Sequence, residues 1–131
     1  MKNLYLIILI IFLLSSKVYS QTIVLSPTGD GGFENGETLE ANGWTVVNPA
    51  TNQWWAGTAT SYAGTRSAYI SNDNGVSNQY TNTTPQVAHL YRDVVFPANE
   101  IPVLSFYWKG YGEGNYDDLS IYLAETSFVP V

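Results

Sequence analysis

The chain has 131 residues, with ten tyrosines, four tryptophans, no cysteine and a formal net charge of −6. This length fits one small domain, and its aromatic, weakly charged composition argues against intrinsic disorder. The lack of cysteine excludes disulfide bonds, and the acidic charge excludes clustered basic side chains of the kind that bind nucleic acid or anionic lipid. Such a surface suits calcium, neutral glycans or basic partners.

Residues 1–20 have the three parts of a secretory signal peptide. Lys2 supplies the positive charge, Leu4–Leu14 forms the apolar core, and a short polar stretch ends at the expected cleavage after Ser20. The apolar run is shorter than the ~20 residues of a membrane-spanning helix, so cleavage is favoured over a retained anchor. We therefore expect residues 21–131 to be a secreted or cell-surface domain, with no membrane insertion after cleavage. Its formal net charge is then −8, because three basic side chains remain beside 11 acidic ones.

Short strand signals follow the leader, separated by clusters of Gly, Asn, Asp, Pro and Ser. The last two alternate apolar and polar side chains, as in an antiparallel sheet with one buried and one solvated face. No helical period is visible beyond the leader, so the sequence predicts an all-β sandwich. The expected strands are Gly43–Val47, Gln53–Gly57, Arg66–Ser71, Val87–Phe96, Val103–Lys109 and Leu119–Ala124.

The number of strands bears on whether the sandwich is complete. A two-sheet sandwich of this kind usually has about seven or more strands, and six can be placed here. Either a further strand at Thr22–Leu25 completes the fold, or the sequence is a fragment of a longer domain. We favour the fragment, because residues 128–131 follow a strand without a closing element. The sandwich is therefore expected to be incomplete at its C-terminus.

Three acidic residues in glycine- and asparagine-rich loops are candidate metal ligands: Glu34, Asp73 and Asp118. Calcium takes about six to eight oxygens from carboxylates, amides and backbone carbonyls, all of which such loops supply. No complete calcium-loop motif is present, so each acid can instead be a turn residue or a solvated surface group. Glu34 is the strongest candidate, because its neighbour Phe33 favours partial burial and a buried carboxylate needs a partner.

The aromatic residues are candidates for ligand binding. Trp54 and Trp55 are adjacent in an expected strand, so their side chains point to opposite faces. An exposed ring there, near Tyr62 and Tyr80, could stack on a sugar ring. In the alternative, both tryptophans pack into the core, as we expect for Trp108. The predicted ligand-binding residues are Trp54, Trp55 and Tyr62.

Catalytic groups are scarce. A Ser-His-acid triad would need His89, the single histidine, which lies in the expected strand Val87–Phe96 with a surface or inter-strand role. The histidine and cysteine counts also exclude a zinc site of ordinary composition. Paired carboxylates for glycoside hydrolysis cannot be read from a sequence, and no motif supports them. We therefore predict no catalytic residue in this chain.

Seven segments carry a family resemblance: GDGGFENG, NGWTVVN, NQWWAGTA, GTRSAYISND, HLYRDVVFP, LSFYWKGYGE and YDDLSIYL. From about Thr28 to Val131, the chain resembles jelly-roll domains of secreted Bacteroidota proteins, close to the cleaved-adhesin domains of gingipains and to the choice-of-anchor J domain. The resemblance to the MAM domain is more distant. It implies a concanavalin-A-like jelly roll, stabilised by calcium, in a multidomain protein exported by the type IX system. In the family pattern the acid of the Phe-Glu pair serves the metal, which carries over to Glu34, with Asp73 and Asp118 as looser candidates.

Composition and resemblance together favour an extracellular binding or adhesin module that recognises a glycan or a protein. The family pattern also implies further strands and downstream domains beyond residue 131. One alternative is an accessory domain of a secreted hydrolase, either a protease or a glycosidase. Another is a spacer that binds no ligand.

Overall fold

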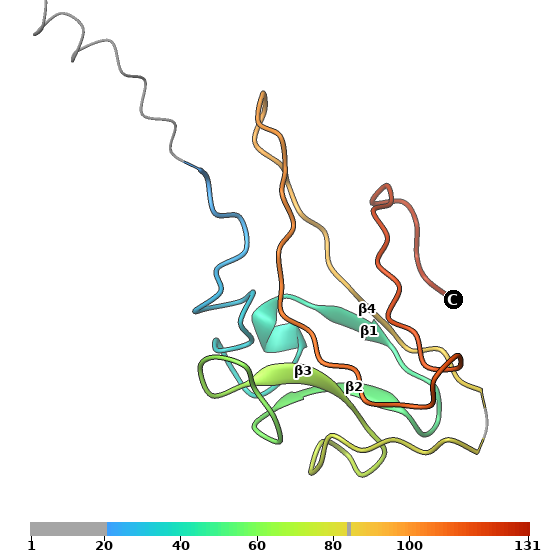
Figure 1. Cartoon of the computed structure of the whole chain (residues 1–131). Helices are drawn as coiled ribbons and strands as arrows, with labels where there is room; N and C mark the ends of the chain where they lie inside the picture. The colour runs from blue at the N-terminus through green and yellow to red at the C-terminus, as the bar shows by residue number, and fades with distance from the viewer. Residues whose placement is uncertain (1–20, 84) are drawn as a thin grey trace, which may run out of the picture.

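The computed structural model describes residues 21–83 and 85–131 (Figure 1). The expected signal peptide, residues 1–20, lies outside the described residues. Within them, no helix is long and apolar enough to cross a membrane. The elements are the 3-10 helix η1 (Glu40–Asn42) and the strands β1 (Thr45–Val47), β2 (Gln53–Gly57), β3 (Ser67–Ser71) and β4 (His89–Tyr91).

The four strands form two antiparallel pairs. Strand β1 pairs with β4, and Val46 lies opposite Leu90. Strand β2 pairs with β3 over five residues, from Gln53 opposite Ser71 to Gly57 opposite Ser67. The described residues therefore confirm the all-β class, with η1 as a single short helical turn.

The β2–β3 pair forms because its residues suit a pleated surface. Trp54 lies opposite Ile70, and Trp55 lies opposite Tyr69. Cross-strand pairs of aromatic and β-branched side chains stabilise a sheet by about 0.2–1 kcal/mol each relative to alanine pairs. Strand β2 has the bounds that the sequence predicts, and β3 begins one residue later than predicted.

The core is small and occupies both faces of the β2–β3 pair, because Ala56 lies on the Trp54 side and Tyr69 lies on the Trp55 side. Leu39, Ala56 and Tyr69 are buried hydrophobic residues, and Asn42 and Ser71 are fully buried polar ones. Asn42 is satisfied by its own hydrogen bonds, since its amide donates to the Thr38 carbonyl at 2.8 Å and accepts from the Asn35 N–H at 2.9 Å. This side chain fixes the loop that carries η1, at one end of the sheets (Figure 1).

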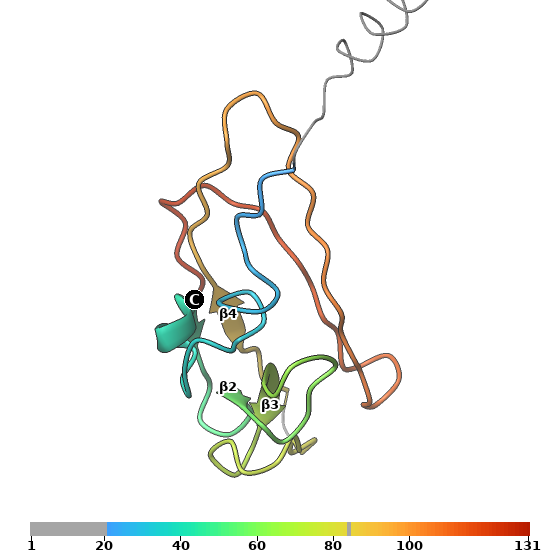
Figure 2. The same ribbon diagram turned by 90° about the vertical axis from the view of Figure 1, so that its left-hand side faces the viewer.

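After β4 the chain leaves the sheets in a long extended excursion that reverses at turns at residues 98–99, 114–116 and 126–127 (Figures 1 and 2). The predicted strands Val103–Lys109 and Leu119–Ala124 do not form here, and neither does one at Thr22–Leu25. Leu104 is 64% exposed and Trp108 is 65% exposed, so the expectation of Trp108 in the core is wrong. A strand forms only where an adjacent strand pairs with its backbone N–H and C=O groups. Alternating apolar and polar residues indicate which side chains would face the core, but they do not show whether such a partner strand is present.

Candidate functional site

The Glu34 carboxylate closes the turn that precedes β3. Its Oε1 accepts the Thr65 N–H at 2.8 Å and the Arg66 N–H at 2.9 Å, and its Oε2 accepts the Thr65 hydroxyl at 2.7 Å. These bonds, the Thr65 hydroxyl first among them, hold the pKa of Glu34 below its ordinary value. Gly64 packs against the same carboxylate with φ 70°. Glu34 therefore has a structural role here.

Asp73 organises the turn that follows β3. The Ser71 hydroxyl donates to its Oδ1 at 2.6 Å, and the Ser77 hydroxyl donates to its Oδ2 at 2.6 Å. The Ser77 N–H adds a third bond to Oδ1 at 2.9 Å. These donors, led by the Ser71 hydroxyl, lower the pKa of Asp73 to about 2. The carboxylate is thus held by the loop that contains it.

The predicted calcium ligands do not come together. Asp118 is exposed in the segment after β4, and the described residues contain no group of three or more His, Cys, Asp or Glu side chains that could hold a metal. Both oxygens of Glu34 and of Asp73 already accept N–H or O–H donors, which lie where a cation would have to bind. The three carboxylates in this arrangement do not fit a calcium site. Calcium stabilisation stays a prediction of the family resemblance.

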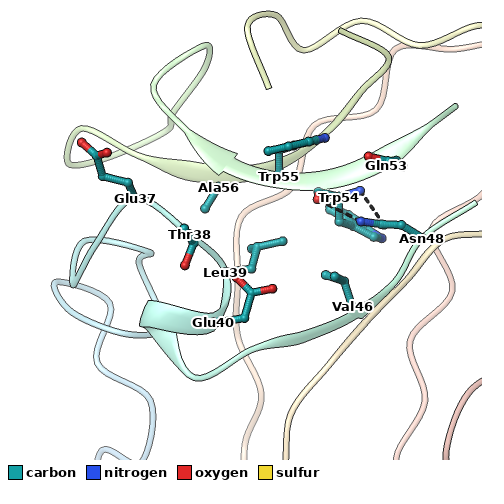
Figure 3. Close-up of a pocket in the computed structure, with 10 residues that line it drawn as sticks. All are labelled: Glu37, Thr38, Leu39, Glu40, Val46, Asn48, Gln53, Trp54, Trp55 and Ala56. Atoms are coloured by element: carbon teal, nitrogen blue, oxygen red, sulfur yellow. Dashed lines mark hydrogen bonds between the residues drawn. The ribbon is translucent and has the colours of Figure 1, made fainter. Parts of the chain in front are cut away.

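The two adjacent tryptophans lie on opposite faces of β2, as predicted (Figure 3). Trp54 faces the space between the sheets, where it lines a cavity of about 230 Å³ with Leu39 and Val46. Its indole N–H donates to the Ala88 carbonyl at 3.1 Å. Trp55 packs on the other face against Gly75, and its indole nitrogen is buried without a hydrogen-bond partner among the described residues. Both rings pack against neighbouring residues, and ligand binding by Trp54 and Trp55 stays a prediction.

Tyr62, the third predicted ligand-binding residue, contacts another aromatic ring. It is 72% exposed and stacks on Tyr107, with ring centroids 3.8 Å apart and an interplanar angle of 18°. The contact joins the loop before β3 to the extended segment after β4. The three predicted residues therefore occupy three different environments.

An ion pair that sequence reasoning missed ties the N-terminal glycine-rich turn to the strand region. Arg92 Nη1 donates to Asp30 Oδ2 at 3.0 Å and to the Asn42 carbonyl at 3.2 Å, and its guanidinium lies over the Trp44 ring. Burial is the largest influence on the pKa of Asp30 and raises it, but the bonds from the Ser26 N–H and from Arg92 outweigh it and lower the pKa. The scarcity of basic residues is the one signal that could have pointed to Arg92.

A larger hollow lies between three loops and has a volume of about 540 Å³. We refer to it as the polar groove. Its walls come from the turn before β2, from the connection between β3 and β4, and from the turn at residues 113–117. Its polar and charged lining residues include Asn52, Tyr80, Thr81, Asn82, Gln86, Glu113 and Asp117. Tyr116 lines it as well and is 82% exposed.

Hydrogen bonds join opposite walls of the polar groove. The Tyr80 hydroxyl donates to Asp117 Oδ2 at 2.8 Å, and the Asn82 amide donates to Glu113 Oε1 at 2.9 Å. Asp117 Oδ2 also accepts the Glu113 N–H at 2.6 Å. The hydrogen bond to Asp117 raises the pKa of Tyr80, because loss of the phenol proton would place two negative charges together. The turn at residues 113–117 is thereby fixed to the β3–β4 connection.

The third wall is fixed by the Asn52 side chain. Its amide donates to the Thr81 carbonyl at 2.7 Å and accepts the Thr81 N–H at 2.8 Å. The Asn52 N–H in turn donates to Gln86 Oε1 at 2.9 Å. One asparagine thus holds the β3–β4 connection in place by bonds that resemble those of a strand pair.

Comparisons with known proteins add no relative. No protein-family model matches the chain, and neither a curated protein nor a solved structure matches it. The family resemblance stays a hypothesis that depends on its seven segments.

Proposed function

We propose that the chain is an extracellular binding module of the adhesin type, which recognises a glycan or a protein. The observation that carries this proposal is a set of exposed aromatic side chains on the segment after β4. Trp108 is 65% exposed and Tyr111 is 95% exposed, and Tyr107 and Tyr116 lie between these values. Such rings combine a large apolar face with a polar group, and they are enriched where proteins bind partners.

The remaining support comes from the sequence and the fold. The leader predicts export, and the acidic charge favours a neutral or basic partner over nucleic acid. Two antiparallel strand pairs are compatible with a jelly-roll sandwich, which is the finer fold that we propose. The proposal does not depend on calcium, which enters its test as a condition.

The test is binding of the full chain to an array of immobilised glycans and extracellular proteins, with calcium or with EDTA. We expect saturable binding to at least one class of partner. The double variant Trp108→Ala/Tyr111→Ala should weaken that binding without changing the melting temperature, because both side chains are exposed. An array without any saturable signal in either buffer would contradict the proposal and favour a spacer.

A further inference from the structure

We propose that the polar groove binds a neutral sugar, an inference that rests on the proposed binding function and names its ligand and site. The groove is a hollow of about 540 Å³, within the range of about 300–1,000 Å³ that is typical of small-ligand sites. Such sites combine apolar or aromatic walls with a few convergent polar groups. The groove has aromatic walls and convergent polar groups, which are the features that a sugar-binding site needs.

The polar groups of the groove match sugar hydroxyls, each of which donates one hydrogen bond and accepts others. Glu113 uses Oε1 for Asn82, and Asp117 uses Oδ2 for Tyr80. No hydrogen bond within the described residues engages Glu113 Oε2 or Asp117 Oδ1, so each carboxylate keeps an oxygen that can accept from a hydroxyl. Gln86 and Asn82 add amide groups, which both donate and accept.

The aromatic residues of the groove match the apolar faces of a pyranose ring. Tyr116 is 82% exposed, so a ligand can reach its ring. Tyr80 is half-buried, and the bond from its hydroxyl to Asp117 fixes its orientation. A ring that offers a large apolar area beside polar groups suits a sugar, whose C–H faces and hydroxyls alternate.

Charge selects a neutral sugar over an acidic one. Glu113 and Asp117 are the charged residues that line the groove, and both are acidic. A uronate, sialate or sulfate group would be repelled there, and the rest of the domain is acidic as well. The carboxylates are also bonded to neutral donors within the groove, and the remaining polar lining side chains are three amides, two phenols and the Thr81 hydroxyl. This composition favours a hydroxyl-rich ligand over a basic peptide.

The groove is also ordered before any ligand enters it. Tyr80–Asp117 and Asn82–Glu113 join two of the walls, and Asn52 holds the third through Thr81. A site with fixed walls has less conformational freedom to lose on binding. The fixed walls therefore lower the entropic cost of binding, which favours even a sugar that makes few contacts.

The test is titration of the full chain with maltotriose, mannotriose and lactose, followed by saturation-transfer NMR and calorimetry. Sialyllactose and hexalysine serve as the anionic and cationic probes. We expect at least one neutral sugar to bind, with no binding of sialyllactose. Tyr116→Ala removes one ring contact with the sugar, and Asn82→Ala removes one hydrogen-bonding amide. Each variant should therefore lower the affinity for the neutral sugar by about tenfold.

Tyr122→Ala is the matched control, because Tyr122 is 85% exposed and does not line the groove. We expect it to leave the affinity unchanged. Melting temperatures of all three variants should stay near that of the wild type, because the side chains removed are exposed.

The outcomes separate this inference from the proposed function. A neutral sugar that binds Tyr116→Ala and Asn82→Ala as tightly as wild type overturns the groove as its site and leaves a binding module. If hexalysine is the only probe that binds, or if no sugar binds, the proposal of a sugar ligand is overturned. Only an additional lack of any partner on the glycan and protein array would also overturn the proposed function.

Discussion

The Glu34 and Asp73 carboxylates each accept three hydrogen bonds from donors in the turns that flank β3. These bonds are stronger to the ionised acid, and protonation would turn one acceptor oxygen into a donor, so both carboxyls have lowered pKa values. Protonation of these two carboxyls should therefore weaken the hydrogen bonds that hold the turns on either side of β3.

Asp73 should contribute stability that acid removes. Its folded pKa of about 2 lies below the ordinary value of 3.8, so the contribution is complete above about pH 4 and is lost as the pH falls through about 2. Denaturant titrations from about pH 6 to about pH 2 should show Asp73→Asn less stable than wild type at the upper end, with the difference shrinking steadily toward the lower end. Parallel profiles over this whole range would contradict the assignment.

Glu34→Gln separates a structural role from metal binding. The amide cannot reproduce all three acceptor contacts, so we expect the melting temperature to fall by the same amount with calcium and with EDTA. The control is Glu37→Gln, whose side chain is 88% exposed and pairs with Arg66 at 3.4 Å, a pair that contributes little to stability. A loss seen only with calcium would identify Glu34 as a metal ligand after all.

At the scale of elements, β2 and β3 depend on the loop that follows them. Gly75 has φ 84° and lies under the Trp55 ring, while its carbonyl accepts the Tyr69 hydroxyl at 2.7 Å. The loop thus covers the outer face of the sheet. This cover explains why Trp55 is half-buried although it points away from the space between the sheets.

Replacing Gly75 should loosen this cover. A Cβ there would lie 3.0 Å from Trp55 Cε3, and the left-handed backbone costs a non-glycine residue about 1–2 kcal/mol. We expect Gly75→Ala to reduce the free energy of unfolding by at least this amount, measured by urea titration. Gly114→Ala is the control, because its Cβ would meet no atom within 4 Å. Equal stability of the two variants would rule out the packing role.

Sequence reasoning placed all four strands, with wider bounds for β1 and β4 and with the closest bounds for the pair that is near in the chain. The β2–β3 pair combines aromatic and β-branched residues with nearby turns, so residues 53–57 were predicted with the observed bounds. The segment at residues 103–109 has a strand pattern without a partner strand, which no local pattern can show. The polar groove was missed for a related reason: Asn82 and Glu113 are ordinary turn residues, and their contact spans 31 positions.

For the whole molecule, charge limits the partners. The predicted exported domain carries three basic and 11 acidic side chains, and two of its basic residues, Arg66 and Arg92, are engaged in ion pairs. A surface of this kind lacks the clustered cations that polyanions need. Such a surface favours neutral or basic partners over polyanions.

This charge gives a direct expectation for polyanions. At low ionic strength, where electrostatic attraction is strongest, the protein should neither be retained on immobilised heparin nor sediment with phosphatidylserine vesicles. Column chromatography and vesicle sedimentation measure the two. Retention that disappears with added salt would show a basic patch and contradict the expected class of partner.

The extended segment after β4 also determines where a protease can cut the molecule. Of the three sites for trypsin beyond residue 20, Arg66 and Arg92 are half-buried, whereas Lys109 lies exposed in unpaired backbone. Limited digestion should therefore cut first after Lys109, and mass spectrometry should find the two sheets together in the larger fragment. That single cut would separate the turn at residues 113–117 from the chain that faces it, so the groove would depend on its cross-wall hydrogen bonds alone. In a protease-rich medium, the lifetime of one peptide bond would then limit how long the module can hold its ligand.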